Sequence, residues 1–308
     1  MSSAAGLALH GHMVRRLPTA ADVSTRSPIV LTPRDVEILA GVHLHGFLTT
    51  ELVELAFFPP TSTDRCSPSS RAYQRLRELW LWGYLERVEL PVARVLGGRR
   101  PFLYALGRQA LPFLELSAGA AALPVQVRRL DRLDHVFVDH DLKAAALWAN
   151  VRAQLRGRGC RLLWIGEREL RARRMRVRAP DVDRWLPFLP DAYFAVMYPG
   201  GDVQAYVVEI DMGTLTLRRF ARKVGAFEAA LDDGVFRRNF KRETFDVLIL
   251  TQSRRRVETL RQVASRVVES DRHDQYLMAT FDALEPSVFG TAAWQDLNGE
   301  QYTGVLWH

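Results

Sequence analysis

Apolar residues recur at helical spacing in three short stretches near the start of the chain, at about residues 32–46, 49–59 and 71–82. The first begins with Thr32 and Pro33, a hydroxyl N-cap followed by a proline whose missing amide hydrogen costs nothing in a first helical turn. Residues 85–90 then alternate like a β-strand, and after the turn at Gly97 residues 101–106 are expected to return as a second strand. The pattern therefore predicts three helices followed by a β-hairpin.

Three short helices and a hairpin make up the winged-helix fold, whose third helix commonly enters the major groove of DNA. The outer face of the predicted third helix carries side chains that can hydrogen-bond base edges. These residues are Arg71, Gln74 and Arg75. The predicted hairpin tip carries side chains suited to phosphates beside the groove. These residues are Arg94, Arg99 and Arg100. We therefore predict a winged-helix domain that binds double-stranded DNA, although the same fold also serves protein contacts.

The pattern changes after residue 135, where strands alternate with helices. The strands are expected at 160–165, 189–196, 204–211, 245–251 and 275–280, and the helices at 142–155, 215–231 and 257–268. An α-β-β-β-α-β-α-β order is typical of a sheet flanked by helices, so the fold class is α/β (α+β). Residues 166–180 are expected to be a basic, exposed stretch. We divide the chain into a flexible arm (1–28), a winged helix (29–114), a linker (115–134) and a second domain (135–308).

Acidic residues occupy particular places on two of the predicted strands. Asp191 opens one strand directly after Pro190, and Glu209 lies near the end of the next strand. Antiparallel hairpin neighbours would bring these two carboxylates to the same end of the sheet, and Asp211 shares the face of Glu209 because strand side chains alternate with period two. Carboxylates that converge repel one another unless a cation intervenes, and Mg²⁺ or Mn²⁺ prefers such oxygen ligands. We therefore predict a metal site at Asp191, Glu209 and Asp211.

The composition favours a polyanionic partner. The chain of 308 residues has 42 Lys and Arg against 35 Asp and Glu, a formal net charge of +7, and such an excess most simply indicates nucleic acid. The cysteines, Cys66 and Cys160, are too few for a disulfide framework or a four-thiolate zinc site and suit a reducing cytosol. No apolar run reaches the roughly 18 residues that a membrane span needs. We expect a cytoplasmic protein with no membrane partner.

Several enzyme classes lack their signatures in this sequence. No zinc-binding H-E-x-x-H, no phosphate-binding G-x-x-x-x-G-K-[ST] and no hydrolase G-x-S-x-G occurs. Basic clusters instead recur through the second domain and are expected to surround the acidic site, where they could hold a phosphodiester. The clusters are Arg171, Arg173, Arg174, Arg176 and Arg178; Arg218, Arg219, Arg222 and Lys223; Arg237, Arg238, Lys241 and Arg242; and Arg254, Arg255 and Arg256.

These elements and motifs together resemble known families. The αβββαβ order with Pro190-Asp191 and Glu209-Ile210-Asp211 looks like the core of the PD-(D/E)XK nuclease superfamily. The whole layout, over roughly residues 30–255, resembles the replication-relaxation family of bacterial mobile-element proteins. The further matching features are the winged helix, His140-Asp141-Leu142, Ala192 after Asp191, the run 208–214, and a helix with Arg222-Lys223 and Phe227. The resemblance implies a role in replication or DNA relaxation of plasmids or integrative elements.

The sequence departs from the nuclease pattern at one position. Asp211 stands where that superfamily usually has a lysine that assists the attacking water or offsets charge in the transition state. Either Asp211 itself acts as base or ligand, or Lys223 in the next helix reaches back into the site. His140 is a further candidate, because related nucleases often carry an acidic group on their first helix, and Asp141 is the other candidate there. The candidate catalytic residues are Asp191, Glu209, Asp211, Lys223 and His140.

These observations leave three functions open. The first is a DNA-binding protein of a bacterial mobile element whose second domain nicks or cleaves DNA with Mg²⁺ or Mn²⁺ during replication, relaxation or transfer. The second is a non-catalytic regulator of plasmid replication or transcription whose nuclease-like domain is inactive. The third is an adaptor that recruits replication or conjugation proteins. A homodimer is compatible with each of them.

Overall fold

The protein divides into two compact units, Met1–Ala145 and Ala146–His308. The computed structural model describes residues 14–16, 29–59, 69–89, 102–117, 135–179, 184–285 and 293–303. The division falls inside helix α6 (His135–Leu155), whereas the sequence placed the start of the second domain at residue 135. The first half of this helix packs its side chains with the first unit. The predicted linker at 115–134 lies largely outside the described residues.

Three helices form as predicted in the first unit: α2 (Pro33–His45), α3 (Thr50–Phe57) and α4 (Ser69–Leu81). Thr32 caps α2 in a capping box, in which the backbone N–H of Asp35 donates to the Thr32 hydroxyl and the Thr32 N–H donates to the Asp35 carboxylate. Thr49 caps α3 in a similar way. A short 3₁₀ segment, η2 (Arg108–Ala110), and α5 (Leu111–Ser117) complete the helices before α6.

A four-stranded antiparallel sheet accompanies these helices, in the order β1-β3-β4-β2. The predicted hairpin is β3 (Leu85–Glu89) with β4 (Phe102–Leu106), and β2 (Leu48–Thr49) pairs with β4. Within the predicted flexible arm at 1–28, the strand β1 (Val14–Arg16) pairs with β3. A three-residue strand is too short to show an alternating pattern, and β1 satisfies hydrogen bonds that would otherwise stay open at the edge of the hairpin.

The first unit has its own apolar core between the sheet and the helices. Phe47, Val88 and Leu103 are fully buried and pack with Val138 of the first half of α6. This contact explains why α6 begins as part of the first unit although its sequence pattern suggested the second.

A seven-stranded mixed sheet forms the second unit, in the order β13-β12-β11-β10-β9-β8-β5. Strands β5 (Arg161–Gly166), β8 (Ala192–Met197) and β9 (Val203–Asp211) are antiparallel neighbours. Strands β9, β10 (Asp246–Thr251) and β11 (Tyr276–Thr280) run parallel. The sequence predicted these five strands but missed β12 (Ala293–Gln295) and β13 (Gln301–Thr303), which add two antiparallel strands at the edge.

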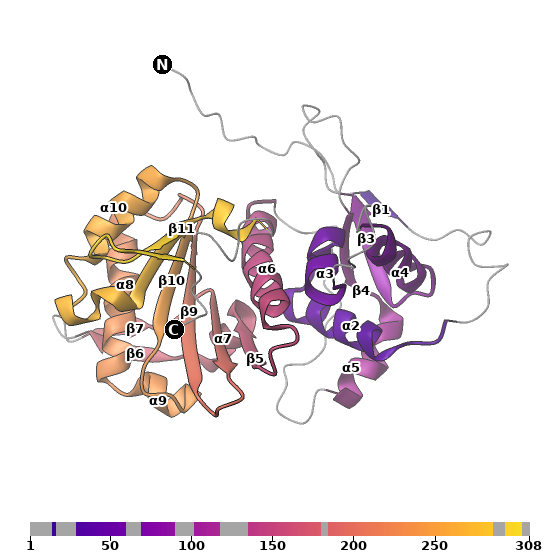
Figure 1. Ribbon diagram of the computed structural model, residues 1–308, viewed down its shortest axis with the longest axis horizontal. Helices are drawn as coiled ribbons and strands as arrows, with labels where there is room; N and C mark the ends of the chain where they lie inside the picture. Colours follow the sequence, from indigo (N-terminus) through magenta and orange to yellow (C-terminus); the bar gives the residue numbers. More distant parts are fainter. Residues whose placement is uncertain are drawn as a thin grey trace, which may run out of the picture. The chain divides into compact units, whose positions relative to one another are not determined.

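Helices cover the face of this sheet that carries the odd-numbered residues of β8 and β9. They are α8 (Leu217–Asp232), α9 (Val235–Phe240) and α10 (Arg254–Ala264), of which α8 and α10 lie side by side (Figure 1). Their apolar side chains, among them Phe220 and Phe236, form one core with Tyr193 and Val207 of the sheet. Short 3₁₀ segments, η4 (Ser270–Gln275) and η5 (Phe281–Leu284), flank β11.

The basic stretch at 166–180 is more ordered than its charge suggested. It contains helix α7 (Glu167–Arg173) and strand β6 (Arg176–Ala179), which pairs with β7 (Arg184–Pro187) in a separate two-stranded sheet. The arginines of this stretch are exposed, as predicted, but Met175 and Val177 alternate with them and are buried in the core, which the expectation of an exposed stretch did not include.

The other face of the large sheet carries an aromatic row across its antiparallel strands. The rings of Trp164 and Phe194 stack with centroids 5.1 Å apart, and those of Phe194 and Tyr206 with centroids 4.6 Å apart. The second half of α6 belongs to this unit, where the Asn150 side chain donates to the Leu284 carbonyl at 2.8 Å. Among the described residues, no helix combines the length and the apolar character needed to cross a membrane.

Candidate functional site

The β8–β9 hairpin brings Asp191 and Glu209 together at one end of the large sheet. The turn closes with two backbone hydrogen bonds between Tyr198 and residues 201–202, and the register pairs Ala192 with Val208. Asp191 and Glu209 are the next residues on the two strands. The Ile210 N–H donates to Asp191 Oδ2 at 2.7 Å, which fixes the carboxylate against the neighbouring strand. The predicted meeting of these two acids is confirmed.

Lys223, on the helix that follows β9, reaches this pair of carboxylates. Its ammonium Nζ lies 3.4 Å from Asp191 Oδ1 and forms an ion pair with Glu209 Oε2. The side chains are 10% exposed for Asp191, 4% for Glu209 and 24% for Lys223. We call these three residues the acid–lysine cluster. Of the two positions considered for a lysine or its substitute, Lys223 is the one that lies beside both acids.

The electrostatics of the acid–lysine cluster favour a charged lysine. Burial alone would lower the pKa of Lys223, but the Glu209 and Asp191 carboxylates outweigh burial and hold that pKa above its ordinary value. The ammonium therefore stays protonated at neutral pH. An ammonium held between two carboxylates can orient an anionic group and offset developing negative charge. It also reduces the repulsion between the two acids.

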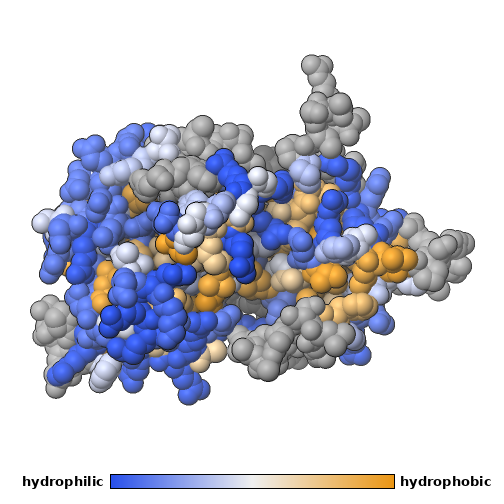
Figure 2. All heavy atoms as spheres, turned by 60° about the horizontal axis from the view of Figure 1, so that its bottom comes forward, coloured by the Kyte–Doolittle hydropathy of each residue, from blue (hydrophilic) through white to orange (hydrophobic). Residues whose placement is uncertain are grey.

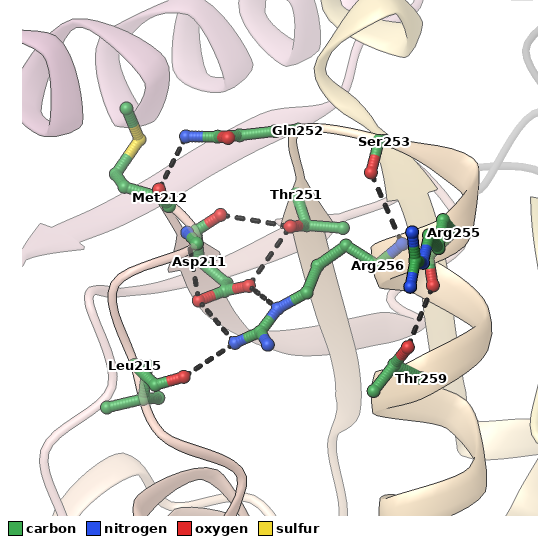
Figure 3. A network of polar contacts seen from close by, with 10 residues as sticks. Asp211, Met212, Leu215, Thr251, Gln252, Ser253, Arg255, Arg256 and Thr259 are labelled. Atoms are coloured by element: carbon green, nitrogen blue, oxygen red, sulfur yellow. Dashed lines mark hydrogen bonds and ion pairs between the residues drawn. The ribbon is translucent and has the colours of Figure 1, made fainter. Parts of the chain in front are cut away.

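Asp211 takes a different partner, although it follows Glu209 in the same alternation along β9. The Arg256 guanidinium on α10 holds its carboxylate by two hydrogen bonds, Nε to Oδ2 at 2.7 Å and Nη2 to Oδ1 at 3.3 Å (Figure 3). The Thr251 hydroxyl donates to Oδ2 at 3.0 Å, and the Gly213 N–H donates to Oδ1 at 3.2 Å. The Asp211 side chain is completely buried.

This network corrects the predicted three-carboxylate metal site. Within the described part of the second unit, no three carboxylate, imidazole or thiolate ligand atoms lie within 4.8 Å of one another. Arg256 also donates to the Leu215 carbonyl at 2.7 Å, so it ties the loop before α8 to the start of α10 (Figure 3). The physical reason is that a buried carboxylate requires a partner, and Arg256 supplies one outside the acid–lysine cluster.

In the sequence, Arg256 is one member of the basic cluster Arg254, Arg255 and Arg256. Its neighbours Arg254 and Arg255 are exposed, as are Arg218, Arg219 and Arg222 at the start of α8. Both helices begin after the carboxyl ends of parallel strands, at the end of the sheet that also carries Glu209 and Asp211. These five exposed arginines therefore form a basic rim at the same end as the acid–lysine cluster. The helical period of α10 could have distinguished Arg256 from these exposed arginines, because Arg256 lies one turn before the buried Leu260.

His140 belongs to the first half of α6 and so to the first unit. Its Nδ1 lies 3.6 Å from the Asp141 carboxylate, and both side chains are partly exposed. A catalytic role for His140 stays a prediction.

Two of the predicted DNA contacts in the first unit are exposed. Gln74 and Arg71 lie on the outer side of α4, where the Arg71 guanidinium also donates to the Pro59 carbonyl at 3.1 Å. The predicted phosphate contacts Arg94, Arg99 and Arg100 fall outside the described residues.

The expectation that Arg75 points outward is wrong. Its guanidinium turns to Asp35, with Nε to Oδ1 at 2.7 Å and Nη2 to Oδ2 at 2.5 Å, and it also pairs with Glu78 and the Val30 carbonyl. The Asp35 side chain is 1% exposed. Hydrogen bonding to Arg75 and Thr32 overcomes burial, the largest effect, and leaves the pKa of Asp35 below its usual value. Arg75 therefore joins α4 to the first turn of α2.

Replacing Arg75 with alanine is expected to lower the free energy of unfolding by roughly 1.5–3 kcal/mol, because Asp35 loses its charged hydrogen-bond partner. Urea unfolding followed by circular dichroism measures the change. Gln74→Ala, one residue away and exposed, is the matched control and is expected to leave stability within about 0.5 kcal/mol of wild type. Equal stability of the two variants would contradict this structural role.

Comparison with protein-family models matches residues 39–247 to the replication-relaxation family. The match covers about two thirds of the chain. The chain belongs to the replication-relaxation family. Comparison with curated proteins and with solved structures found no match.

The replication-relaxation match includes residues from both units. It begins at Leu39 in α2 and ends at Val247 in β10. The acid–lysine cluster therefore lies inside the segment that defines this replication-relaxation protein. Thr251 and Arg256, which hold Asp211, lie beyond it.

Proposed function

We propose that this replication-relaxation protein binds DNA through its first unit and cleaves a DNA phosphodiester with its second unit, using Mg²⁺ or Mn²⁺. The observation that carries the proposal is the acid–lysine cluster, in which two carboxylates from neighbouring strands share one lysine. Membership of the family suggests a role in replication or relaxation. Cleavage of one or both strands is the chemistry by which such a protein would change DNA topology.

The order of elements around the cluster supports a nuclease of the PD-(D/E)XK type. Helix α6 precedes three antiparallel strands, β5, β8 and β9, and α8 then leads to β10, which runs parallel to β9. In that arrangement the acids belong to the second and third strands; here Asp191 directly precedes β8 and Glu209 lies on β9. Lys223 on α8 then serves in place of the lysine that is absent from position 211.

The donor set fits a hard divalent cation. Asp191 and Glu209 supply carboxylate oxygens, which Mg²⁺ and Mn²⁺ prefer, and no sulfur or imidazole ligand is required. When bound, the cation would polarise the phosphate and lower the pKa of a water molecule. The Lys223 side chain is 24% exposed, and its ammonium offsets the charge of the same two carboxylates.

The protein's own residues have distinct tasks in this proposal. Asp191 is fixed by the Ile210 N–H and so presents one oriented ligand. Lys223 holds the attacking water or the anionic phosphate close to the acids. The exposed arginines of the basic rim bind the phosphates on either side of the cleaved bond. The first unit, a winged helix in this proposal, selects the DNA through the exposed Arg71 and Gln74 on α4.

Nicking of supercoiled plasmid tests the enzymatic half. Wild-type protein with Mg²⁺ or Mn²⁺ is expected to convert supercoiled DNA to open circles or linear DNA, and EDTA is expected to stop the conversion. Glu209→Gln keeps the size of the side chain but removes its charge, so it should lose this activity while its DNA binding persists. Asp202→Asn, an exposed acid in the β8–β9 turn, is the matched control. The absence of wild-type conversion with either metal would overturn the proposal.

One observation favours a second candidate function, a non-catalytic regulator of replication or transcription. Lys223 already neutralises one carboxylate charge, and Arg256 neutralises Asp211, so the fold needs no dication for its charge balance. This candidate predicts DNA binding that is indifferent to EDTA and to Glu209→Gln, with no nicking. The plasmid experiment therefore separates the two candidates.

A further inference from the structure

The β6–β7 hairpin exposes a tryptophan on the outside of the second unit. Trp185 is 57% exposed. Among the other described tryptophans, Trp82 is partly exposed, and four are at most 8% exposed, namely Trp80, Trp148, Trp164 and Trp294. A single exposed apolar side chain is ordinary on a protein surface. Whether Trp185 could bind a ligand therefore depends on the residues around it.

The outward-facing residues around Trp185 include two arginines, and the strand register fixes their positions. Val177 and Leu186 point inward and belong to the apolar core, so the alternate residues of both strands point outward. The register pairs Arg178 with Trp185 and Arg176 with Pro187. The indole thus lies opposite one arginine and diagonal to another, within reach of both long side chains. We call these four outward residues, Arg176, Arg178, Trp185 and Pro187, the hairpin face.

The hairpin face rests on a fixed support. The Arg178 N–H donates to the Asp233 carboxylate at 2.7 Å, and the Phe188 N–H donates to the Met175 carbonyl at 3.0 Å. The buried residues Val177 and Leu186 anchor the opposite side. A stacking platform held in this way loses little conformational freedom when a ligand binds.

Further cations lie at the ends of the neighbouring helices. Arg174 and Lys241 follow α7 and α9 as exposed C-cap residues with φ of 50° and 58°. Left-handed backbone is unfavourable for such residues, yet both positions hold a cation where glycine would be the usual choice. No ion pair within the described residues engages Arg174, Arg176 or Lys241. The left part of Figure 2, which is the second unit, shows a mostly hydrophilic surface.

We propose that the hairpin face binds single-stranded DNA. A base stacks on the Trp185 indole, and Arg176 and Arg178 contact the phosphates on either side. Paired duplex bases are already stacked on their neighbours, so a single strand is the form that can use an exposed ring. The choice of DNA over RNA rests on the proposed function, in which a nick releases a strand end.

Fluorescence anisotropy with labelled dT20 in EDTA tests this proposal on the full chain, without cleavage. Trp185→Ala is expected to weaken binding on the order of tenfold, and Trp185→Phe to retain most of it, because stacking on an aromatic ring tolerates its identity. Arg176→Ala should also weaken binding and reduce the salt dependence. Arg266→Ala, which removes an exposed arginine just after the end of α10, is the matched charge control and should bind as wild type does.

Each outcome bears on one claim. If Trp185→Ala binds dT20 with wild-type affinity, the hairpin face does not bind single-stranded DNA, even if plasmid nicking succeeds. Loss of binding in Trp185→Ala supports it, even if no nicking is found. A labelled rU20 strand bound tenfold more tightly than dT20, with the same dependence on Trp185, overturns the choice of DNA.

Discussion

Replacement of Arg256 with methionine is expected to lower the free energy of unfolding by about 3–5 kcal/mol, the usual cost of leaving one member of a buried ion pair alone. The Asp211 carboxylate is fully buried, and Arg256 supplies two of its hydrogen bonds. Thr251 and Gly213 would remain as neutral donors, which cannot replace a cation. Urea unfolding at neutral pH measures the loss.

Two controls show whether the lost pair is the cause. Arg255→Met removes an exposed arginine one residue away and is expected to change stability by no more than about 0.5 kcal/mol. The double variant Asp211→Leu with Arg256→Met removes both charges and should recover most of the loss, because apolar replacements of a buried pair are commonly neutral. An Arg256→Met protein as stable as Arg255→Met would contradict the role of the pair.

The meeting of Asp191 and Glu209 was predictable because it depends on short-range rules. The turn at 198–202 sets the hairpin register, and the period of two fixes the faces. A slip of one residue would have turned the flanking apolar residues to the wrong side, so the burial pattern leaves little choice. The caps at Thr32 and Thr49 were predictable for the same reason, since each satisfies backbone donors within three residues.

The partners of Asp211 and Arg75 were not predictable, because they come from distant elements. Arg256 lies 45 residues after Asp211, and Asp35 lies 40 residues before Arg75. Helical spacing places the Cα of Arg75 on an outer side of α4, but its long side chain turns back to a buried acid. Long arginine side chains can thus reverse the direction that periodicity assigns.

The β6–β7 hairpin was missed because of the many arginines in its sequence, although its alternating apolar residues could have predicted it. The arginine-rich stretch at 166–180 suggested an exposed segment, yet Met175 and Val177 alternate with Arg176 and Arg178. Leu186 and Phe188 repeat the alternation on the returning strand. The pattern of buried residues, and not the net charge, determines the β6–β7 hairpin.

Replacement of Lys223 with methionine tests the acid–lysine cluster in both its proposed tasks. Under the proposed function, plasmid nicking is expected to fall roughly 100- to 1000-fold, as when one charge-stabilising donor is removed from an active site. Stability should also fall, since Asp191 and Glu209 would be left buried without their cation. The measurements are initial nicking rates and urea unfolding across pH.

The pH dependence of stability identifies the origin of that loss. The pKa of Lys223 is raised in the folded protein, so its contribution is complete below the ordinary lysine value of 10.5 and is lost as pH rises through the folded value. Lys223→Met should lack this alkaline loss and should approach wild-type stability as the pH falls and the acids gain protons. Lys223→Met combined with Glu209→Gln should recover stability, because it removes the repulsion between the acids, but it should not nick, since Glu209→Gln alone removes a proposed metal ligand. A single Lys223→Met variant that loses stability but nicks at the wild-type rate would show that Lys223 only balances charge, and the catalytic role assigned to it would then be wrong.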